Sequence, residues 1–393
     1  MMWNECKELQ EYLVGMRRDL HKIPELGLDL PKTRAYVTEK LNEYGIPYVL
    51  SEKDSSVVAA ITGGKPGKTV ALRADMDALP IQEETGVEYA SLNAGCMHAC
   101  GHDTHTAMLL GAAKVLAAHK DELQGNVKLF FQTAEEQAKG SRIIIENGGL
   151  EGVDAIYGTH IGTILSKDIP SGTLIVCPGP VMASYDRFVV KVKGTGCHGS
   201  TPEKGIDPVN IAAHIVVSLE AISAREFNAC QPNVLTIGKL NGGSQYNIIP
   251  DEVLIEGTIR TLDEAVRQQI ARRIGEISES TAKAFGGSIE YEMDWGAPPV
   301  VNTPECAALA ADAVRDIFGE KLITHVDNPN MGGEDFACYL QSVPGAFMFL
   351  SSSNPAKGTD IAHHNCKFNV DEDVLWQGSA AFVAITEKFL NGK

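Results

Sequence analysis

Two kinds of hydrophobic pattern alternate along the chain as far as His160. Short runs of β-branched and aromatic residues predict strands, whereas apolar residues three or four positions apart predict helices. The expected strands are Val57–Thr62, Thr69–Asp75, Val127–Thr133 and Ala155–His160. The expected helices are Glu8–Lys22, Thr33–Tyr44, His105–His119 and Gly140–Asn147. Strands that alternate with helices are typical of an α/β sheet covered on both faces.

The order of the expected elements changes near residue 184. It becomes strand, helix, strand, strand, helix, strand, at Arg187–Lys193, Pro208–Arg225, Asn233–Leu240, Glu252–Thr261, Asp263–Phe285 and Ser288–Asp294. This order is typical of a ferredoxin-like α+β sandwich. After Pro298-Pro299 the helix and strand alternation returns, at Pro304–Phe318, Ala346–Ser351 and Asp373–Leu390. We therefore predict a discontinuous α/β/α domain with a mixed sheet, residues 1–183 and 298–393, and an inserted ferredoxin-like domain, residues 184–297.

Composition and charge narrow the class of protein. A length of 393 residues favours two domains. The net charge of −17, from 51 acidic and 34 basic residues, argues against a nucleic-acid partner or an anionic membrane surface. Nine cysteines in so long a chain do not indicate a disulfide framework. No apolar signal segment opens the sequence, and the longest mainly apolar run, Thr106–Ala118, is too short to span a bilayer. We expect a soluble cytoplasmic protein.

Three side chains that commonly bind metals alternate at His98, Cys100 and His102. On an extended or turn backbone all three would face one way. Thiolate and imidazole are ligands that zinc and related cations prefer, although the spacing does not match a structural zinc finger. The alternative is an ordinary helix start capped by Asp103 or Thr104, with incidental cysteines.

Further candidate side chains lie at or just past the ends of expected strands: Asp75, Glu135, Glu136 and His160. Open α/β sheets bind their ligands at the carboxyl edge of the strands. In the Glu135-Glu136 pair, one carboxylate could bind a metal while the other accepts a proton from metal-bound water. The alternative is a pair of glutamates on a solvated helix start.

The remaining candidates are weaker when each is taken alone. A lone histidine at the position of His160 is more often a core or loop histidine, and His363-His364 lies in a polar loop. Asp75 could orient a metal-bound histidine. The alternatives are an N-cap or a surface ion pair with Arg73.

Motifs that run the whole length of the chain carry a family resemblance. They are Arg17–Gly27, Arg73–Pro80, Met97–Asp103, Ala134–Glu136, His160, His198, Asn247–Asp251, Gly257–Arg260, Gly332–Phe336 and His363–Asn365. In this order they resemble the M20 metallopeptidase family. The closer resemblance is to its subgroup of aminoacylase-like and hippurate-hydrolase-like amidohydrolases, for which Met-His-Ala-Cys-Gly-His-Asp is specific.

The resemblance implies a metal site and a general base. One or two divalent ions, Zn, Mn or Co, are expected on Cys100, His102, Glu136, His160 and His364. Glu135 is expected to be the general base and Asp75 an accessory carboxylate. His98 is left with a supporting or structural role.

The resemblance also assigns residues of the inserted domain. His198 is expected to reach the active site, from the partner subunit of a dimer in many relatives, and to stabilise the oxyanion. Asn247 and Arg260 are candidates for gripping the substrate carboxylate. We expect a homodimer or higher homo-oligomer that forms through residues 184–297.

The implied activity is hydrolysis of the amide bond of N-acyl or N-aroyl amino acids to a carboxylate and a free amino acid. Metal-activated water would attack the amide carbon, and Glu135 would take its proton. The first alternative is a metal-dependent exopeptidase, a dipeptidase or carboxypeptidase, acting on short peptides. The second is a non-catalytic metal-binding or assembly protein.

The chain departs from the family pattern at several positions. Thr133 and Cys366 stand where proline is usual, and Asn369 where aspartate is common. The Gly-rich stretch after the glutamate pair is Gln137–Ser141, and Ile161–Ile164 lacks the frequent aromatic-proline pair. No expected metal ligand or base is lost, so these changes bear on substrate preference.

Overall fold

The computed structural model describes residues 1–392, and the chain forms two compact units. Unit 1 comprises Met1–Val181, Val301–Asn330 and the chain from Glu334 onward. Unit 2 comprises Met182–Val300 and Met331–Gly333. The insertion expected from the sequence, residues 184–297, falls inside unit 2.

Unit 1 contains an eight-stranded sheet with the order β1-β2-β4-β3-β5-β16-β6-β15. Parallel pairs join β3 to β4, β3 to β5, β5 to β16 and β6 to β15. Antiparallel pairs join β1 to β2, β2 to β4 and β6 to β16, so the expected mixed α/β sheet is confirmed. The strands are β1 Tyr48–Leu50, β2 Val57–Thr62, β3 Lys65–Asp75, β4 Gln124–Gln132, β5 Ala155–Gly162, β6 Leu174–Ile175, β15 Leu322–Ile323 and β16 Gly345–Ser351.

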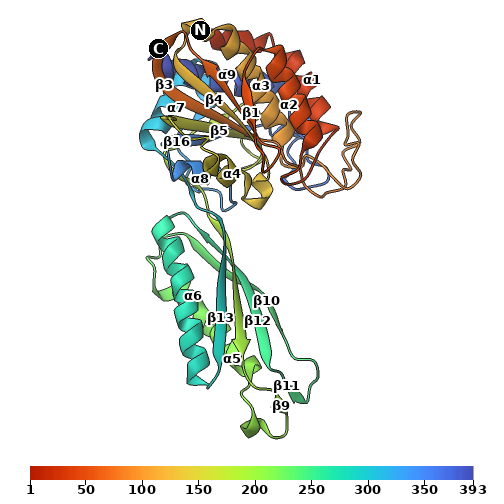
Figure 1. Ribbon diagram of the computed structural model, residues 1–393, viewed down its shortest axis with the longest axis vertical. Helices are drawn as coiled ribbons and strands as arrows, with labels where there is room; N and C mark the ends of the chain where they lie inside the picture. The colour runs from red at the N-terminus through yellow and green to blue at the C-terminus, as the bar shows by residue number, and fades with distance from the viewer. Residues whose placement is uncertain (393) are drawn as a thin grey trace. The chain divides into compact units, whose positions relative to one another are not determined.

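Helices cover both faces of this sheet (Figure 1). The longer ones are α1 Gln10–His21, α2 Pro31–Glu43, α3 His102–Ala118, α7 Pro304–Phe318 and α9 Leu375–Asn391, and the shorter ones are α4 Gly140–Glu146 and α8 Ala337–Leu340. α3 and α9 pack on β3 and β4. Because β4 lies on one side of β3 and β5 on the other, right-handed crossovers place α3 and α4 on opposite faces. A crevice is expected at the carboxyl ends of β3 and β4, where the two connections diverge.

The start of α3 differs from the expectation. The sequence pattern predicted a helix from His105, but the helix begins at His102, directly after Gly101. Gly101 has a left-handed backbone (φ 89°), and no side chain caps the helix. Neither Asp103 nor Thr104 acts as the N-cap, and His102 and His105 share the first turn.

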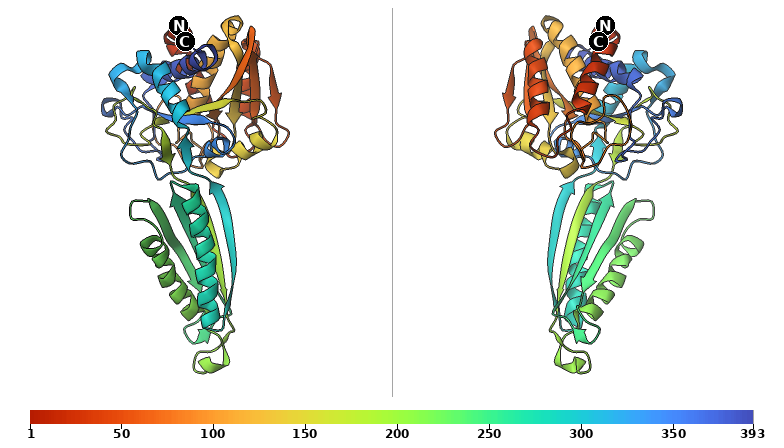
Figure 2. Two further views of the ribbon diagram at one scale, coloured as in Figure 1. Left: turned by 90° about the vertical axis from the view of Figure 1, so that its left-hand side faces the viewer. Right: turned by 90° about the vertical axis from the view of Figure 1, so that its right-hand side faces the viewer.

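Unit 2 has the element order strand, helix, strand, strand, helix, strand, as the sequence predicted. The elements are β8 Tyr185–Lys193, α5 Pro208–Arg225, β10 Asn233–Gly242, β12 Glu252–Thr261, α6 Glu264–Ala284 and β13 Ser288–Ala297. The four strands form an antiparallel sheet with the order β10-β12-β8-β13. Both helices lie on one face of this sheet (Figure 2), where their apolar sides and the strands form a separate core. Two short strands, β9 Cys197–His198 and β11 Ile248–Ile249, pair with each other.

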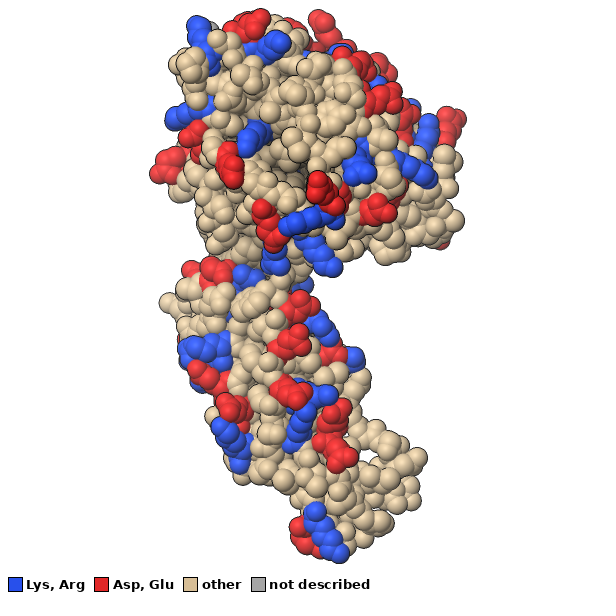
Figure 3. Space-filling model, in the orientation of Figure 1, with Lys and Arg blue, Asp and Glu red and all other residues tan. Residues whose placement is uncertain are grey.

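The surface carries charges of both signs. Figure 3 shows acidic and basic side chains interspersed on the displayed face of each unit. All nine cysteines are free thiols, as expected. Within residues 1–392, the helices are too short or too polar for any of them to cross a membrane.

Candidate metal centre

The predicted site residues of unit 1 meet at the carboxyl edge of its parallel strands. Asp75 is the last residue of β3, Glu135 and Glu136 follow the end of β4, and His160 lies near the end of β5. Since β3 pairs parallel with both β4 and β5, these ends lie side by side. The expectation that these four residues share one edge of the sheet is confirmed.

Gly101 positions the cysteine and the histidine of the central motif. A Cβ atom at this residue would come within 2.9 Å of the Ile161 side chain, so the left-handed turn requires glycine. The turn places Cys100 beside the start of α3. As a result, ligand atoms of Cys100, His102 and Glu136 all lie within 4.8 Å of one another.

Two histidines direct an unshared electron pair toward this cluster. The Nδ1 of His102 lies 2.8 Å from the carbonyl oxygen of Asp77, and that of His160 lies 2.8 Å from the carbonyl of Ile161. A carbonyl only accepts, so each Nδ1 carries hydrogen and each Nε2 is left to bind. The Nε2 of His160 lies 3.4 Å from the Cys100 sulfur. The Nε2 of His102 is buried and has no hydrogen-bond partner within residues 1–392.

The electrostatics of His102 also fit a cation. Burial alone would lower its pKa, but Asp75, Asp77 and Glu136 raise it to about 10. These carboxylates therefore favour positive charge at this position. A divalent ion supplies that charge while Nε2 remains a ligand. The unpartnered Nε2 of His102, with the sulfur of Cys100 and a carboxylate oxygen of Glu136 close to it, therefore fits a metal centre.

His364 reaches the same cluster from the C-terminal part of the chain. Its backbone is left-handed (φ 62°), and its amide donates to the carbonyl oxygen of Ala99 over 2.9 Å. The Nε2 of His364 lies 3.4 Å from Oε1 of Glu136. The five proposed ligands are thus brought together, although His364 is half-exposed and the others lie deeper.

Glu135 is buried beside the ligands. Its Oε1 accepts the backbone N–H of Asp335 over 3.3 Å, and its Oε2 lies 4.0 Å from Nε2 of His102. Burial and the neighbouring carboxylates Glu334 and Glu136 raise the pKa of Glu135 well above its usual value. A carboxyl group with a raised pKa at this place is suited to accepting and returning a proton.

Asp75 belongs to a buried ion network. Arg73 donates to Asp75 over 2.7 Å and also pairs with Glu334 and Asp335 at 3.0 and 2.8 Å. The ion pair with Arg73 that the sequence suggested is present, but it is buried and not on the surface. The other oxygen of Asp75 lies 2.5 Å from Nδ1 of His105.

Sequence reasoning missed three residues that support the site. Asp77 accepts the backbone N–H groups of Glu135 and Glu136 over 3.0 and 3.2 Å, in addition to orienting His102. His105 accepts the N–H of Ile161 through Nε2 over 2.9 Å, so it braces β5. His363 lies against Cys100. The Asp-Met-Asp spacing and the paired histidines were visible signals, but neither shows which partner each side chain meets.

His98 does not join the cluster. The alternation of His98, Cys100 and His102 predicted a common direction, and this is wrong because the chain turns at Gly101 and continues as a helix. The His98 ring lies 6.2 Å from that of His21, and its nitrogens have no hydrogen-bond partner among the described residues. Burial lowers the pKa of His98 to about 3, so the ring is neutral.

The three predicted residues of the inserted domain lie in unit 2. His198 is exposed on β9, and its Nδ1 accepts the backbone N–H of Ser200 over 3.1 Å. Arg260 is on β12, with its guanidinium 5.7 Å from the centre of the Tyr185 ring. Asn247 lies in an exposed segment before β11. Their roles stay predictions.

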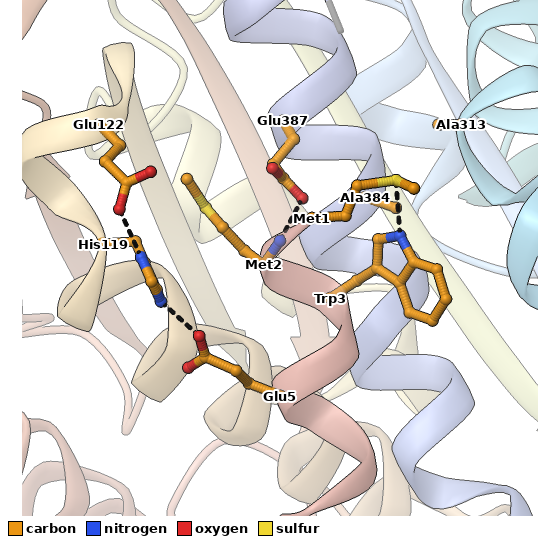
Figure 4. Close-up of a pocket in the computed structure, with 9 residues that line it drawn as sticks. All are labelled: Met1, Met2, Trp3, Glu5, His119, Glu122, Ala313, Ala384 and Glu387. Atoms are coloured by element: carbon orange, nitrogen blue, oxygen red, sulfur yellow. Dashed lines mark hydrogen bonds and ion pairs between the residues drawn. The ribbon is translucent and has the colours of Figure 1, made fainter.

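A pocket of unit 1 lies at the N-terminal 3₁₀ helix η1, Met2–Lys7 (Figure 4). Its polar side chains pair with one another. His119 lies 2.7 Å from both Glu5 and Glu122, and Glu387 accepts the backbone N–H of Met2 over 3.1 Å. The residues that line this pocket include none of the predicted site residues, and their pairing ties η1 to α9.

The fold and the cluster define the class of protein. A thiol, imidazoles and carboxylates meet beside a buried glutamate at the crevice of an open α/β sheet, which is the arrangement of a metal-dependent hydrolase. The chain matches the model of peptidase family M20/M25/M40 over residues 71–388, and it belongs to this family. The expected family is confirmed.

Relatives support the same assignment over nearly the whole chain. N-acetyl-L-cysteine deacetylase of Bacillus subtilis (strain 168) is 42% identical over 375 residues, 94% of this chain and 86% of the relative. Thermostable carboxypeptidase 1 of Saccharolobus solfataricus is 40% identical over 392 residues, 99% of this chain and 98% of the relative. The crystal structure of the Bacillus subtilis YXEP protein, described as a dinuclear metal-binding peptidase of the M20 family, is 35% identical with a TM-score of 0.84, covering 98% of this chain and 99% of that one. The chain is a metal-dependent amidohydrolase.

Proposed function

We propose that this enzyme hydrolyses N-acyl or N-aroyl amino acids to a carboxylate and a free amino acid. The observation that carries the proposal is the buried Glu135 beside Nε2 of His102, which shares a cluster of potential ligands with Cys100 and Glu136. The similarity to a relative named for deacetylating N-acetyl-L-cysteine supports the substrate class.

In this proposal Cys100, His102, Glu136, His160 and His364 hold one or two divalent ions, Zn, Mn or Co. When bound, such ions supply Lewis acidity that polarises an amide carbonyl and acidifies water.

Glu135 performs the proton transfers. Its Oε1 is held by the Asp335 N–H, which leaves Oε2 facing the cluster to accept a proton from the attacking water. The water oxygen bonds to the amide carbon, the C–N bond then breaks, and Glu135 returns the proton to the leaving nitrogen.

We propose that residues 184–297 form a ferredoxin-like lid and dimerisation domain, inserted into a catalytic domain of residues 1–183 and 298–393. The acceptor role of His198 Nδ1 puts the ring hydrogen on Nε2, which is the donor that an oxyanion needs. Arg260 and Asn247 are proposed to bind the substrate carboxylate, to which a guanidinium can donate two parallel hydrogen bonds.

A substrate panel tests the hydrolytic activity. Purified protein loaded with Mn²⁺, Co²⁺ or Zn²⁺ is incubated with N-acetyl and N-benzoyl amino acids, and release of free amino acid is measured. We expect metal-dependent release that Glu135→Gln slows by about 10²–10⁴-fold at unchanged metal content. If no member of the panel is hydrolysed by any metal form, the proposed substrate class is wrong.

A second candidate is an exopeptidase acting on short peptides, which the similarity to thermostable carboxypeptidase 1 favours. The same cluster would serve both reactions, and the difference lies in how the amino end of the substrate is received. Faster turnover of free dipeptides than of their N-acetylated forms would decide for the exopeptidase.

We propose a homodimer or higher homo-oligomer, and light scattering that shows a fully active monomer would contradict it. We also propose a cytoplasmic location, which the nine free thiols support because thiols persist in reducing compartments. Fractionation of the producing cells tests this location.

A further inference from the structure

The ring of His363 lies against the sulfur of Cys100. Its Nδ1 is 3.7 Å from Sγ, within the range of an N–H···S hydrogen bond. The ring is held in place by Phe368, with ring centroids 4.7 Å apart, and it meets the edge of His160 at 5.0 Å. His363, the neighbour of His364 in the sequence, therefore contacts the proposed thiolate ligand Cys100 directly.

The hydrogen bonding of His363 determines which nitrogen carries hydrogen. The backbone N–H of Thr163 points at Nε2 over 3.1 Å. An amide N–H only donates, so Nε2 must be the acceptor and Nδ1 carries the hydrogen. This hydrogen faces the sulfur of Cys100. The arrangement is the reverse of that in His160, whose Nδ1 donates to a carbonyl and whose Nε2 is left to bind.

The end of β5 is shaped to receive this ring. Gly162 has a positive φ of 121°, and a Cβ atom there would lie 2.3 Å from Nε2 of His363. Any side chain at this position would displace the ring, and with it the bond from Thr163. The close approach of the backbone thus holds the ring in the orientation that presents Nδ1–H to Cys100.

Cys100, His160 and His363 have ligand atoms within 4.8 Å of one another, so the three could be read as a metal-binding set. Coordination through Nδ1 of His363 would require hydrogen on Nε2. Two N–H groups would then face each other over 3.1 Å at Thr163, which is repulsive. The position of Thr163 therefore disfavours His363 as a ligand.

We propose that His363 is a positioning residue that donates an N–H···S hydrogen bond to the Cys100 thiolate and does not bind the metal. The inference rests on Cys100 being a ligand in the proposed function. A thiolate lowers the Lewis acidity of the ion it binds because it donates negative charge. A hydrogen bond to the sulfur withdraws part of that charge and fixes the direction of the sulfur lone pairs.

Cobalt-loaded protein provides a readout that is independent of activity. Thiolate-to-Co²⁺ charge transfer gives an absorption band whose energy falls when the sulfur loses a hydrogen-bond donor. We compare His363→Leu, which removes the donor, with two amide variants. His363→Asn places an N–H near the position of Nδ1, whereas His363→Gln places it near Nε2.

We expect the band to move to longer wavelength in His363→Leu and His363→Gln and to return toward its original position in His363→Asn. Loss of a group that orients a ligand should weaken Co²⁺ binding by about 10–100-fold in His363→Leu and His363→Gln. The matched control is His214→Leu in unit 2, because His214 also stacks on a phenylalanine, Phe285, at 4.7 Å. That variant should leave the band unchanged.

Three outcomes would overturn the inference. The first is an unshifted charge-transfer band in His363→Leu and His363→Gln, the two variants without an N–H near the position of Nδ1. If His363→Leu does not fold, the comparison of His363→Asn with His363→Gln still tests the shift. The second is a change in the ligand-field bands, or loss of bound cobalt, in all three variants, because His363 would then be a ligand. The third is absence of the charge-transfer band from the unsubstituted protein. In that case Cys100 is not a ligand, and the proposed set of five ligands is wrong as well. The substrate panel tests the hydrolytic activity independently of this result.

Discussion

Asp77 is the residue whose substitution tests the architecture of the site most directly. Its two carboxylate oxygens accept the N–H groups of Glu135 and Glu136, over 3.0 and 3.2 Å. The 3₁₀ turn η3, Glu135–Gln137, that contains these glutamates is flanked by Ala134 and Ala138. Both alanines have left-handed backbones (φ 48° and 53°), which are unfavourable for residues with a Cβ atom. The turn therefore depends on tertiary hydrogen bonds to keep its shape.

Asp77→Asn preserves the volume but removes one of these two acceptors. If the amide oxygen serves Glu135, the amide nitrogen faces the N–H of Glu136, which loses its partner. A buried donor left unsatisfied costs about 1–3 kcal/mol. The free energy of unfolding of unit 1 should fall by about 2 kcal/mol, which corresponds to a decrease in Tm of about 4–8 °C. A shifted turn also moves the proposed base and one ligand, and we expect kcat to fall by about 10–100-fold.

Calorimetry and steady-state kinetics of the metal-loaded enzyme measure the two effects. The matched control is Asp154→Asn, because Asp154 also accepts a backbone N–H, from Thr69 over 2.8 Å, but away from the carboxyl edge of β3. The control should lose some stability and keep its kcat. An Asp77→Asn enzyme with the Tm and kcat of the parent would refute the reasoning, since the two hydrogen bonds would then hold nothing that catalysis needs.

Three further predictions follow from the contacts of unit 1. Glu135→Gln should lower kcat by about 10²–10⁴-fold with unchanged metal content, since it removes the proton acceptor. Arg73→Met leaves buried carboxylates such as Asp335 without their cation, and calorimetry should show a loss of about 3–5 kcal/mol. The carboxylates of Glu122 and Glu5 raise the pKa of His119 above 6.5, so its protonated form stabilises the fold below that pH. This contribution is lost as the pH rises through the higher pKa of the folded state. His119→Gln should therefore cost about 0.5 kcal/mol near pH 6 and less near pH 9 in urea unfolding.

Each of these predictions has a contrasting result. A Glu135→Gln enzyme that retains its rate would exclude this glutamate as the base. For Arg73, the control is Arg187→Met, because Arg187 pairs with Glu256 on the surface and should matter little. If the two substitutions lowered the free energy of unfolding equally, burial would not explain the stabilising effect of the ion pairs of Arg73. A stability difference at His119 that does not vary with pH would contradict the assigned ion pairs.

Local patterns were sufficient where an element is defined by its own residues. Strand β2, Val57–Thr62, and helix α7, Pro304–Phe318, have the bounds expected from periodicity and from the proline at the helix start. The predicted start of helix α3, His105, lies about one turn too late in the sequence, because the observed start at His102 depends on Gly101. That glycine has a left-handed backbone, and the Ile161 side chain, from a strand distant in the sequence, leaves no room for a Cβ atom there.

The sequence by itself determined which chemical groups are present and at which edge of the sheet they gather. Parallel strands end at one edge, so Asp75, the glutamate pair and His160 were bound to meet. Only the tertiary structure decided what each group does there. His102 and His105 are one helical turn apart, yet their ring nitrogens have different partners. Nδ1 of His102 donates to a carbonyl oxygen, so its Nε2 is free to bind an ion, whereas Nε2 of His105 accepts a backbone N–H and is already occupied. The identity of a histidine does not specify which ring nitrogen carries the hydrogen, because that depends on the partner brought to it by the fold.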